Sequence, residues 1–242
     1  MKTAREAFLY GWKRGIPIAL GYIPVSFTFG FMAVSGGLPA WLVIFISLSN
    51  LTSAGQFAGT NLILGGAGFV EIMLTTFVIN IRYMLMSLSI SQKIEPGVSL
   101  AKRMIFAFGI TDETFSVASM ERGRLSFSYL MGLIAGPIAG WSLGTALGAL
   151  ISKALPESLA MAMGIALYAM FIAIIIPPMK KSKPVIMVVL LSVVITCLLF
   201  YIPVFSFISS GFRVIIATIT AAAVGARLFP VEEKEEREDD RC

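Results

Sequence analysis

Long apolar stretches separated by short polar connections dominate the sequence. Most of them reach the roughly 20 residues that a helix needs to cross a bilayer core about 30 Å thick. The apolar runs are continuous and lack the period-two alternation of barrel strands, so they predict helices and argue against a β-barrel. The pattern predicts an all-α, polytopic membrane helical bundle with eight hydrophobic segments, at residues 15–35, 38–64, 68–90, 104–120, 127–151, 159–178, 184–207 and 211–229.

Two of these segments differ from an ordinary membrane span. Residues 38–64 and 104–120 both carry polar residues and glycines at their centres. Eight full spans would also place the basic loop around Lys93 and Arg103 outside the cell, although Lys and Arg prefer cytoplasmic loops. We therefore expect six full spans plus two broken or re-entrant segments, with both termini in the cytoplasm. This arrangement places all the basic clusters inside: Lys2/Arg5/Lys13/Arg14, Lys93/Lys102/Arg103, Arg122/Arg124, Lys180/Lys181/Lys183 and Arg227.

The composition indicates a single membrane domain. Of 242 residues, 57% are hydrophobic and 14% charged, against about 45–50% and 25% in a soluble domain. We expect a membrane transport domain at 1–229, in the inner or plasma membrane, and a disordered, acidic cytoplasmic tail at 230–242 that contains seven of the fourteen acidic residues. A recruiting function is the alternative for that tail. The scattered bases fit membrane orientation better than nucleic-acid binding.

Glycines, prolines and tryptophans indicate how the helices pack. Glycines recur every four residues from Gly132 to Gly148, which predicts a tight helix contact. Leu-Pro pairs at 38–39 and 155–156 each follow a glycine-rich helix and suggest an internal structural repeat. Helix kinks are expected at Pro17, Pro24, Pro137, Pro177 and Pro203, and interfacial anchoring at Trp12, Trp41 and Trp141.

Three polar constellations lie within the apolar segments. The first crowds hydroxyls, amides and glycines into residues 47–61. Ser53 and Gln56 have the spacing of a capping box, so a half-helix starting near Ser53 would direct its free N–H groups and positive dipole end toward the bilayer centre. Such an end suits a substrate carboxylate. The alternative is a packed helix pair, because small residues also mediate helix contacts in lipid. The candidate site residues are Asn50, Ser53, Gly55, Gln56 and Asn61.

The second and third constellations are charged. Asn80 and Arg82 fall near the middle of 68–90, where an arginine costs about 2.5–3.5 kcal/mol and should face a cavity or a partner. Asp112, the only aspartate before the tail, follows Thr111 and precedes Glu113. One interpretation makes Thr111 the cap of a second half-helix with two acids in its first turn. The other makes Asp112 or Glu113 a group for proton coupling or for a substrate ammonium. We predict an ion pair between Arg82 and one of these acids, which by itself is also compatible with a purely structural role.

Enzymatic chemistry is disfavoured. The chain has no histidine, which removes a Ser–His pair and an HExxH zinc site. A deep aspartyl dyad would need a second aspartate, and no Walker motif is present. We expect no cofactor and no metal.

The motifs together resemble the AzlC family of branched-chain amino-acid permeases. They are Phe27-Thr-Phe-Gly30, Ser53-Ala-Gly-Gln56-Phe-Ala-Gly59, Asn80-Ile-Arg82-Tyr83 and Thr111-Asp112-Glu113-Thr114-Phe115. The resemblance extends over about residues 5–229 and implies ion-driven export of branched-chain amino acids or their analogues. It also implies a small membrane partner of the AzlD type. Many members carry histidine where this chain has Tyr83, so the coupling ion is open.

The transport hypothesis is alternating access around a site in the middle of the membrane. The Ser53–Gln56 helix end would hold the carboxylate, Asp112 and Glu113 the ammonium or a proton, and Phe57 and Met84 an aliphatic side chain. A channel for a small solute and a non-transporting assembly subunit are the alternatives.

Overall fold

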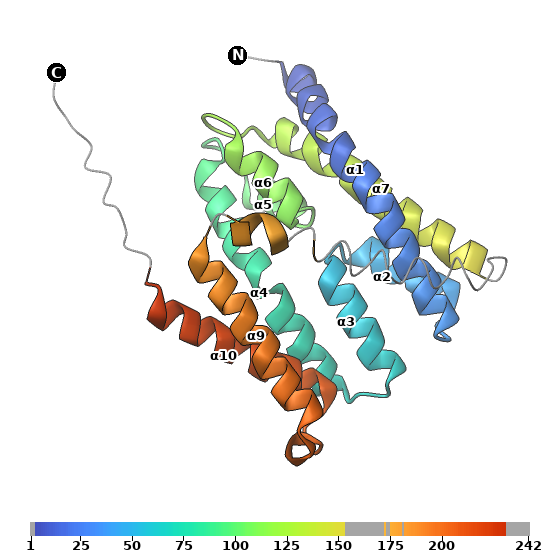
Figure 1. The fold of residues 1–242 in the computed structure, drawn as a ribbon. Coiled ribbons are helices and arrows are strands. Elements are labelled where there is room, and N and C mark those ends of the chain that lie inside the picture. The colour runs from blue at the N-terminus through green and yellow to red at the C-terminus, as the bar shows by residue number, and fades with distance from the viewer. Residues whose placement is uncertain (1–2, 153–171, 173–174, 181, 231–242) are drawn as a thin grey trace. The chain divides into compact units, whose positions relative to one another are not determined.

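The computed structural model describes residues 3–152, 172, 175–180 and 182–230. It divides into two compact units, Met1–Ile172 and Ala173–Cys242, which are treated separately below. The described segments form nine α-helices and one 3₁₀ helix of described bounds, with further helical residues at 175–180, which confirms the all-α prediction (Figure 1). Among the described residues, five helices are long and apolar enough to cross a membrane: Ala4–Ser35, Phe69–Lys93, Phe127–Ile151, Lys183–Tyr201 and Ser210–Leu228.

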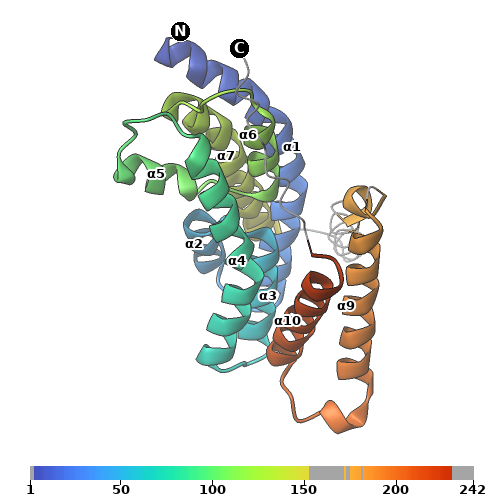
Figure 2. The same ribbon diagram turned by 90° about the vertical axis from the view of Figure 1, so that its left-hand side faces the viewer.

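The first unit is built on a close parallel pair, α1 (Ala4–Ser35) and α7 (Phe127–Ile151), which lie side by side in Figures 1 and 2. The predicted glycine ladder lies in their interface. A Cβ added at Gly132 would lie 2.1 Å from the Phe8 carbonyl oxygen, and one at Gly148 would lie 2.0 Å from that of Phe27. Only glycine permits this backbone approach, so the tight contact predicted from the spacing is confirmed.

Helices α2 (Ala40–Ser49) and α3 (Ser53–Leu64) form a hairpin that enters and leaves at the same end of this pair. Ala40 lies just beyond the end of α1, and Leu64 returns to that end, where its Cδ1 would lie 2.4 Å from a Cβ at Gly36. The chain then turns through residues 65–68 into α4 (Phe69–Lys93). Segment 38–64 is therefore broken at residues 50–52, as predicted, and does not traverse the bundle.

A second hairpin, α5 (Leu100–Ala107) and α6 (Asp112–Met120), enters and leaves at the opposite end. Arg103 on α5 donates to the Ser91 hydroxyl, and Lys93 donates to the carbonyl oxygens of Ser119 and Glu121 after α6. Arg14 on α1 forms an ion pair with Glu121 at 2.9 Å. This end carries the first three predicted basic clusters, and we call it the basic end. The described lysines and arginines of the basic end are Arg5, Lys13, Arg14, Lys93, Lys102, Arg103, Arg122 and Arg124.

The second unit is an antiparallel hairpin of α9 (Lys183–Tyr201) and α10 (Ser210–Leu228). Gly225 on α10 packs against Val188 on α9, so Lys183 and Arg227 lie at the same end of the hairpin, as the charge argument required. The 3₁₀ helix η2 (Pro203–Phe205) makes the turn. Pro203 therefore follows the helix end, and the kink predicted there is wrong, because proline cannot extend the helical hydrogen bonding. The predicted tail and most of the sixth expected span, 159–178, lie outside the described residues, as does the second Leu-Pro pair.

Candidate functional site

The tips of the two hairpins meet the middles of the long helices. At 1.5 Å per residue, α2, α3, α5 and α6 are each about 12–18 Å long, close to half the thickness of a bilayer core. The breaks at 50–52 and 108–111 lie beside the middle of α4, next to Asn80 and Arg82 respectively. Asn80–Tyr83 lie about 18 Å along α4, and Tyr22 lies about 27 Å along α1, which begins beyond the basic end. Polar residues distant in sequence come together here.

Arg82 and Asp112 form the ion pair predicted from the sequence. Arg82 Nη2 lies 2.9 Å from Asp112 Oδ2, with side-chain exposures of 38% and 26%. The guanidinium also donates to the Tyr83 hydroxyl at 3.2 Å and lies 5.0 Å from the centre of that ring. Its Nε is buried without a hydrogen-bond partner. The pair joins α4 to α6 and leaves one donor of Arg82 unused.

Glu113 contacts α1. The Tyr22 hydroxyl donates to the Glu113 carboxylate, and its oxygen lies 2.7 Å from the Thr111 hydroxyl. Thr111 caps α6 in a reciprocal capping box with Thr114, so the capping interpretation of this motif is confirmed. Two acids in the first turn complement the positive end of the α6 dipole. Asp112 and Glu113 thus hold α6 to different helices, Asp112 to α4 and Glu113 to α1.

The beginning of α3 is built differently. Its N-cap residue, Thr52, makes no capping hydrogen bond through its side chain, so the N–H groups of the first turn lack the cap that α6 has. Asn50 Oδ1 instead accepts from the Thr52 amide and hydroxyl, which shapes the break. Asn80 lies over this first turn: a Cβ at Gly55 would lie 2.6 Å from Asn80 Oδ1, an atom that is buried without a hydrogen-bond partner.

Gln56 does not act as the predicted capping residue. Its amide nitrogen donates to the Ser47 hydroxyl, its oxygen accepts from Trp141 Nε1, and the Ser47 hydroxyl meets Thr145 Oγ1, each at 2.8 Å. All four side chains are buried, with at most 2% exposed. The Ser53–Gln56 capping box is therefore wrong, although α3 does begin at Ser53. Gln56 uses its amide to hold α2 and α3 against α7, in line with the packing alternative.

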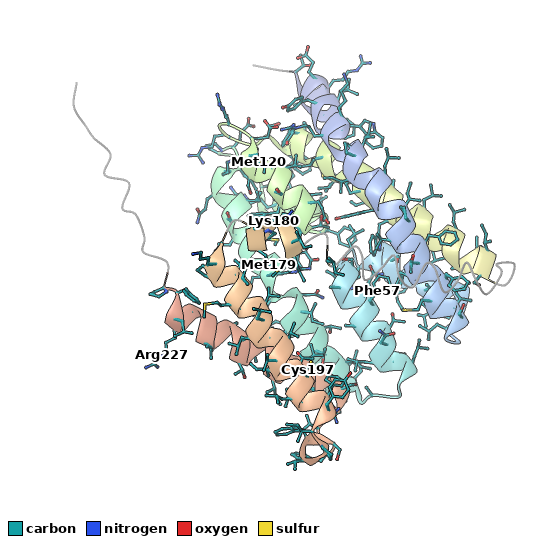
Figure 3. All side chains as sticks on the ribbon, viewed as in Figure 1. Phe57, Met120, Met179, Lys180, Cys197 and Arg227 are labelled. Atoms are coloured by element: carbon teal, nitrogen blue, oxygen red, sulfur yellow. The ribbon has the colours of Figure 1, made fainter. Side chains whose placement is uncertain are left out.

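Four other predicted positions do not join these residues. Asn61 is exposed in the last turn of α3, away from the break. Met84 is 62% exposed on α4, while Phe57, labelled on α3 in Figure 3, is buried edge-on against Phe29 of α1 at 5.3 Å, so these two side chains do not share a pocket. Trp141 is 1% exposed inside the bundle and is not an interfacial anchor. The structure places the other predicted residues in two groups along α4: Asn50, Ser53, Gly55 and Asn80 at the start of α3, and Arg82, Asp112 and Glu113 at the start of α6.

Sequence reasoning missed Tyr22 and the partners of Gln56. Tyr22 packs edge-on against Trp141, with ring centres 5.3 Å apart, and so connects the charged cluster to the neutral network around Gln56. A tyrosine in the middle of an apolar helix could have indicated both its own role and a polar network nearby, because a buried hydroxyl requires a hydrogen-bond partner. Within the described residues no group of three potential metal ligands occurs.

The chain is similar in sequence to known membrane proteins. The family model "AzlC protein" matches residues 17–155, which include both hairpins. The chain is 30% identical over 130 residues to "Inner membrane protein YgaZ" of Escherichia coli, covering 52% of this chain and 53% of that protein. It is 37% identical over 134 residues to a membrane protein of Archaeoglobus fulgidus, covering 53% and 55%. Each match spans about half the length of the relative. No solved structure matches. The chain is a multi-pass membrane protein that belongs to the AzlC family.

Proposed function

We propose that this chain is the large subunit of a secondary transporter that exports branched-chain amino acids or their analogues across the inner membrane. The observation that carries the proposal is that two broken segments have their helix starts beside the middle of α4, an uncapped start at Asn80 and a start with two carboxylates at Arg82. Broken helices at the bilayer centre are a recurrent way to build substrate sites in transporters. Membership of the AzlC family, a transporter family, supports an amino acid as the solute.

The charges suit a zwitterion. The first N–H groups of α3, beside Asn50, Ser53 and Gly55, would receive the substrate carboxylate. Asp112 or Glu113 would receive the ammonium or a coupling proton. Asn80 Oδ1 and Arg82 Nε are buried polar atoms without partners, and a polar solute or water would satisfy them.

The topology follows from the charge at the two ends. The basic end would face the cytoplasm, with α5–α6 re-entering from that side and α2–α3 from the other. The hairpin α9–α10 keeps Lys183 and Arg227 at one end, consistent with both termini inside. Six full spans result if residues 159–178 provide the sixth. A small AzlD-like membrane protein would complete the transporter.

The test is efflux of preloaded labelled leucine, isoleucine and valine from cells making this chain with and without an AzlD-like partner. Asp112→Asn removes the candidate carboxylate, and Glu95→Gln is the matched control because Glu95 is exposed at the basic end. We expect partner-dependent efflux that Asp112→Asn abolishes and Glu95→Gln preserves. No efflux from an assembled complex would exclude these substrates. Flux that does not saturate, together with unitary currents, would indicate a channel.

A further inference from the structure

A second site lies at the basic end, well away from the mid-depth cluster. A half-open cavity of about 670 Å³ lies between the start of α1, the turn before α5 and the start of α7. Its charged wall contains Lys102, Arg122 and Arg124, together with Glu95 and Glu121. Because Glu121 is already paired with Arg14, the remaining lining charges leave an excess of two positive charges.

The bases are held in different ways. Arg124 is fixed by donation to the carbonyl oxygens of Gln92 and Ile94, at 3.0 and 3.5 Å, so part of its bonding capacity shapes the loop. Lys102 lies over the Phe127 ring, 5.4 Å from its centre, which keeps the ammonium at the cavity wall. Arg122 is exposed and next to Gly123, whose φ of +81° turns the loop. The cavity therefore combines a fixed wall with two accessible cations.

Helices α1 and α5, which contribute to the cavity, expose apolar side chains. Leu100, Met104 and Ile105 on α5 are 73%, 67% and 54% exposed, and Phe8 and Leu9 on α1 are 37% and 46% exposed. In a membrane protein such side chains face acyl chains. Around α5, Ile105 lies about 60° from Lys102, while Leu100 and Met104 lie on the opposite side of the helix. A polar, cationic cavity that is bordered by the exposed Ile105 and lined in part by Val98 and Phe127 fits an amphiphile, with its headgroup in the cavity and its chains leaving past Ile105.

We propose that this cavity binds the phosphate headgroup of an anionic phospholipid in the leaflet at the basic end. Lys102 and Arg122 contact the phosphate, and Ile105 with the apolar lining residues Val98 and Phe127 contacts the acyl chains. The same bases would accept a soluble phosphate, but the exposed Ile105 and the apolar lining residues Val98 and Phe127 have no role in binding a soluble ion. Bound there, the lipid connects α1, the α5 turn and α7 and stabilises the basic end of the bundle. The inference does not depend on the transported solute.

The test is lipid binding to the full chain purified in detergent, measured by native mass spectrometry during titration with dioleoyl phosphatidylglycerol or dioleoyl phosphatidylcholine. The test variant is Lys102→Gln/Arg122→Gln. The matched control is Arg5→Gln/Lys13→Gln, which removes two exposed bases of the same end that do not line the cavity. We expect the test variant to lose about thirtyfold in phosphatidylglycerol affinity, equivalent to about 1 kcal/mol per base, and the control to retain wild-type affinity.

Each other result would overturn the proposal. Equal binding of the two lipids, or equal loss in both double variants, would show that the cavity does not select the headgroup. Displacement of phosphatidylglycerol by millimolar inorganic phosphate, with the phosphate held as tightly as the lipid, would assign the site to a soluble anion. The single variant Arg122→Gln guards against misfolding: with an unchanged gel-filtration profile it should still lose severalfold in affinity, and full retention would count against the site.

Discussion

The ion pair between Arg82 and Asp112 offers the sharpest test of the site, because structural and transport roles predict different outcomes for the same variants. The two side chains are 2.9 Å apart and partly exposed, at 38% and 26%. Replacing Asp112 by Asn leaves the guanidinium at mid-depth with Tyr83 as its remaining partner. An uncompensated arginine at the centre of a membrane helix costs about 2.5–3.5 kcal/mol. Partial exposure lowers this value, and we expect each single variant, Arg82→Gln or Asp112→Asn, to lose about 2 kcal/mol of unfolding free energy.

A double-mutant cycle isolates the pair. Once either charge is gone, removing the other costs little more, because no unpaired ion remains. The double variant Arg82→Gln/Asp112→Asn should therefore be about as stable as either single variant, which gives a coupling free energy of about 2 kcal/mol. Reversible unfolding in mixed micelles supplies the measurement. Additive losses, with a coupling free energy below about 0.5 kcal/mol, would refute the pairing.

The chain contains a matched control for the cycle. Arg14 and Glu121 form an ion pair of the same length, 2.9 Å, at the basic end, where their side chains are 46% and 18% exposed. Exposed ion pairs contribute about 0–1 kcal/mol. We expect Arg14→Gln/Glu121→Gln to show a coupling free energy in that range. Equal coupling free energies for the two pairs would show that the position of an ion pair in the bundle does not change its contribution to stability.

Efflux measurements distinguish a structural role of Asp112 from a role in transport. If the pair only holds α4 to α6, the neutral double variant, having no unpaired charge, regains transport along with assembly. If Asp112 receives the ammonium or a proton, the double variant folds and assembles but does not transport. We expect the second outcome. Full efflux by the double variant would reduce Asp112 to a structural residue and favour the assembly-subunit interpretation of the arrangement.

Three further predictions concern other contacts within the first unit. Tyr22→Phe removes the hydroxyl that meets Glu113 and should lower efflux severalfold with about 1–3 kcal/mol lost in stability; unchanged efflux would contradict a role for this contact. Trp141→Phe leaves the Gln56 oxygen unsatisfied and should destabilise by about 1–3 kcal/mol in thermal unfolding, a loss that is absent if water replaces the indole N–H. Gly148→Ala should prevent folding, because its Cβ would lie 2.0 Å from the Phe27 carbonyl oxygen, whereas Gly21→Ala meets nothing within 4 Å and should be tolerated, as gel filtration would show.

Much of this arrangement was predictable because bilayer chemistry limits what a polar residue can do. Arg82 at mid-helix needed a partner, and Asp112 and Glu113 were the available deep acids, so their pairing followed from charge alone. The breaks at 50–52 and 108–111 followed from polar residues where apolar ones were expected. The glycine ladder followed from its spacing, since only close helix contact uses a glycine every four residues.

Side-chain partners between distant segments were not predictable in the same way. Gln56 has the spacing of a capping residue, yet its amide binds Ser47 and Trp141, because burial beside α7 gives both ends of the amide a partner. Trp141 suited an interfacial anchor by residue type alone, whereas the glycines of α7 draw the helix into the bundle and bury the indole. Spacing in the sequence indicates which hydrogen bonds a side chain could make, whereas tertiary packing determines which of them form.

The two half-helix ends differ in a way that bears on mechanism. Both α3 and α6 direct their N-termini, and so their positive dipole ends, toward mid-depth. The α6 end is capped by Thr111 and neutralised by Asp112 and Glu113, while the α3 end has no side-chain cap. An anionic group is therefore accommodated better at α3. A cationic group competes with Arg82 for Asp112, so under the proposed function ammonium binding and release of the Arg82–Asp112 pair are one step. Substrate binding would then loosen the contact between α4 and α6, which is the movement that alternating access requires.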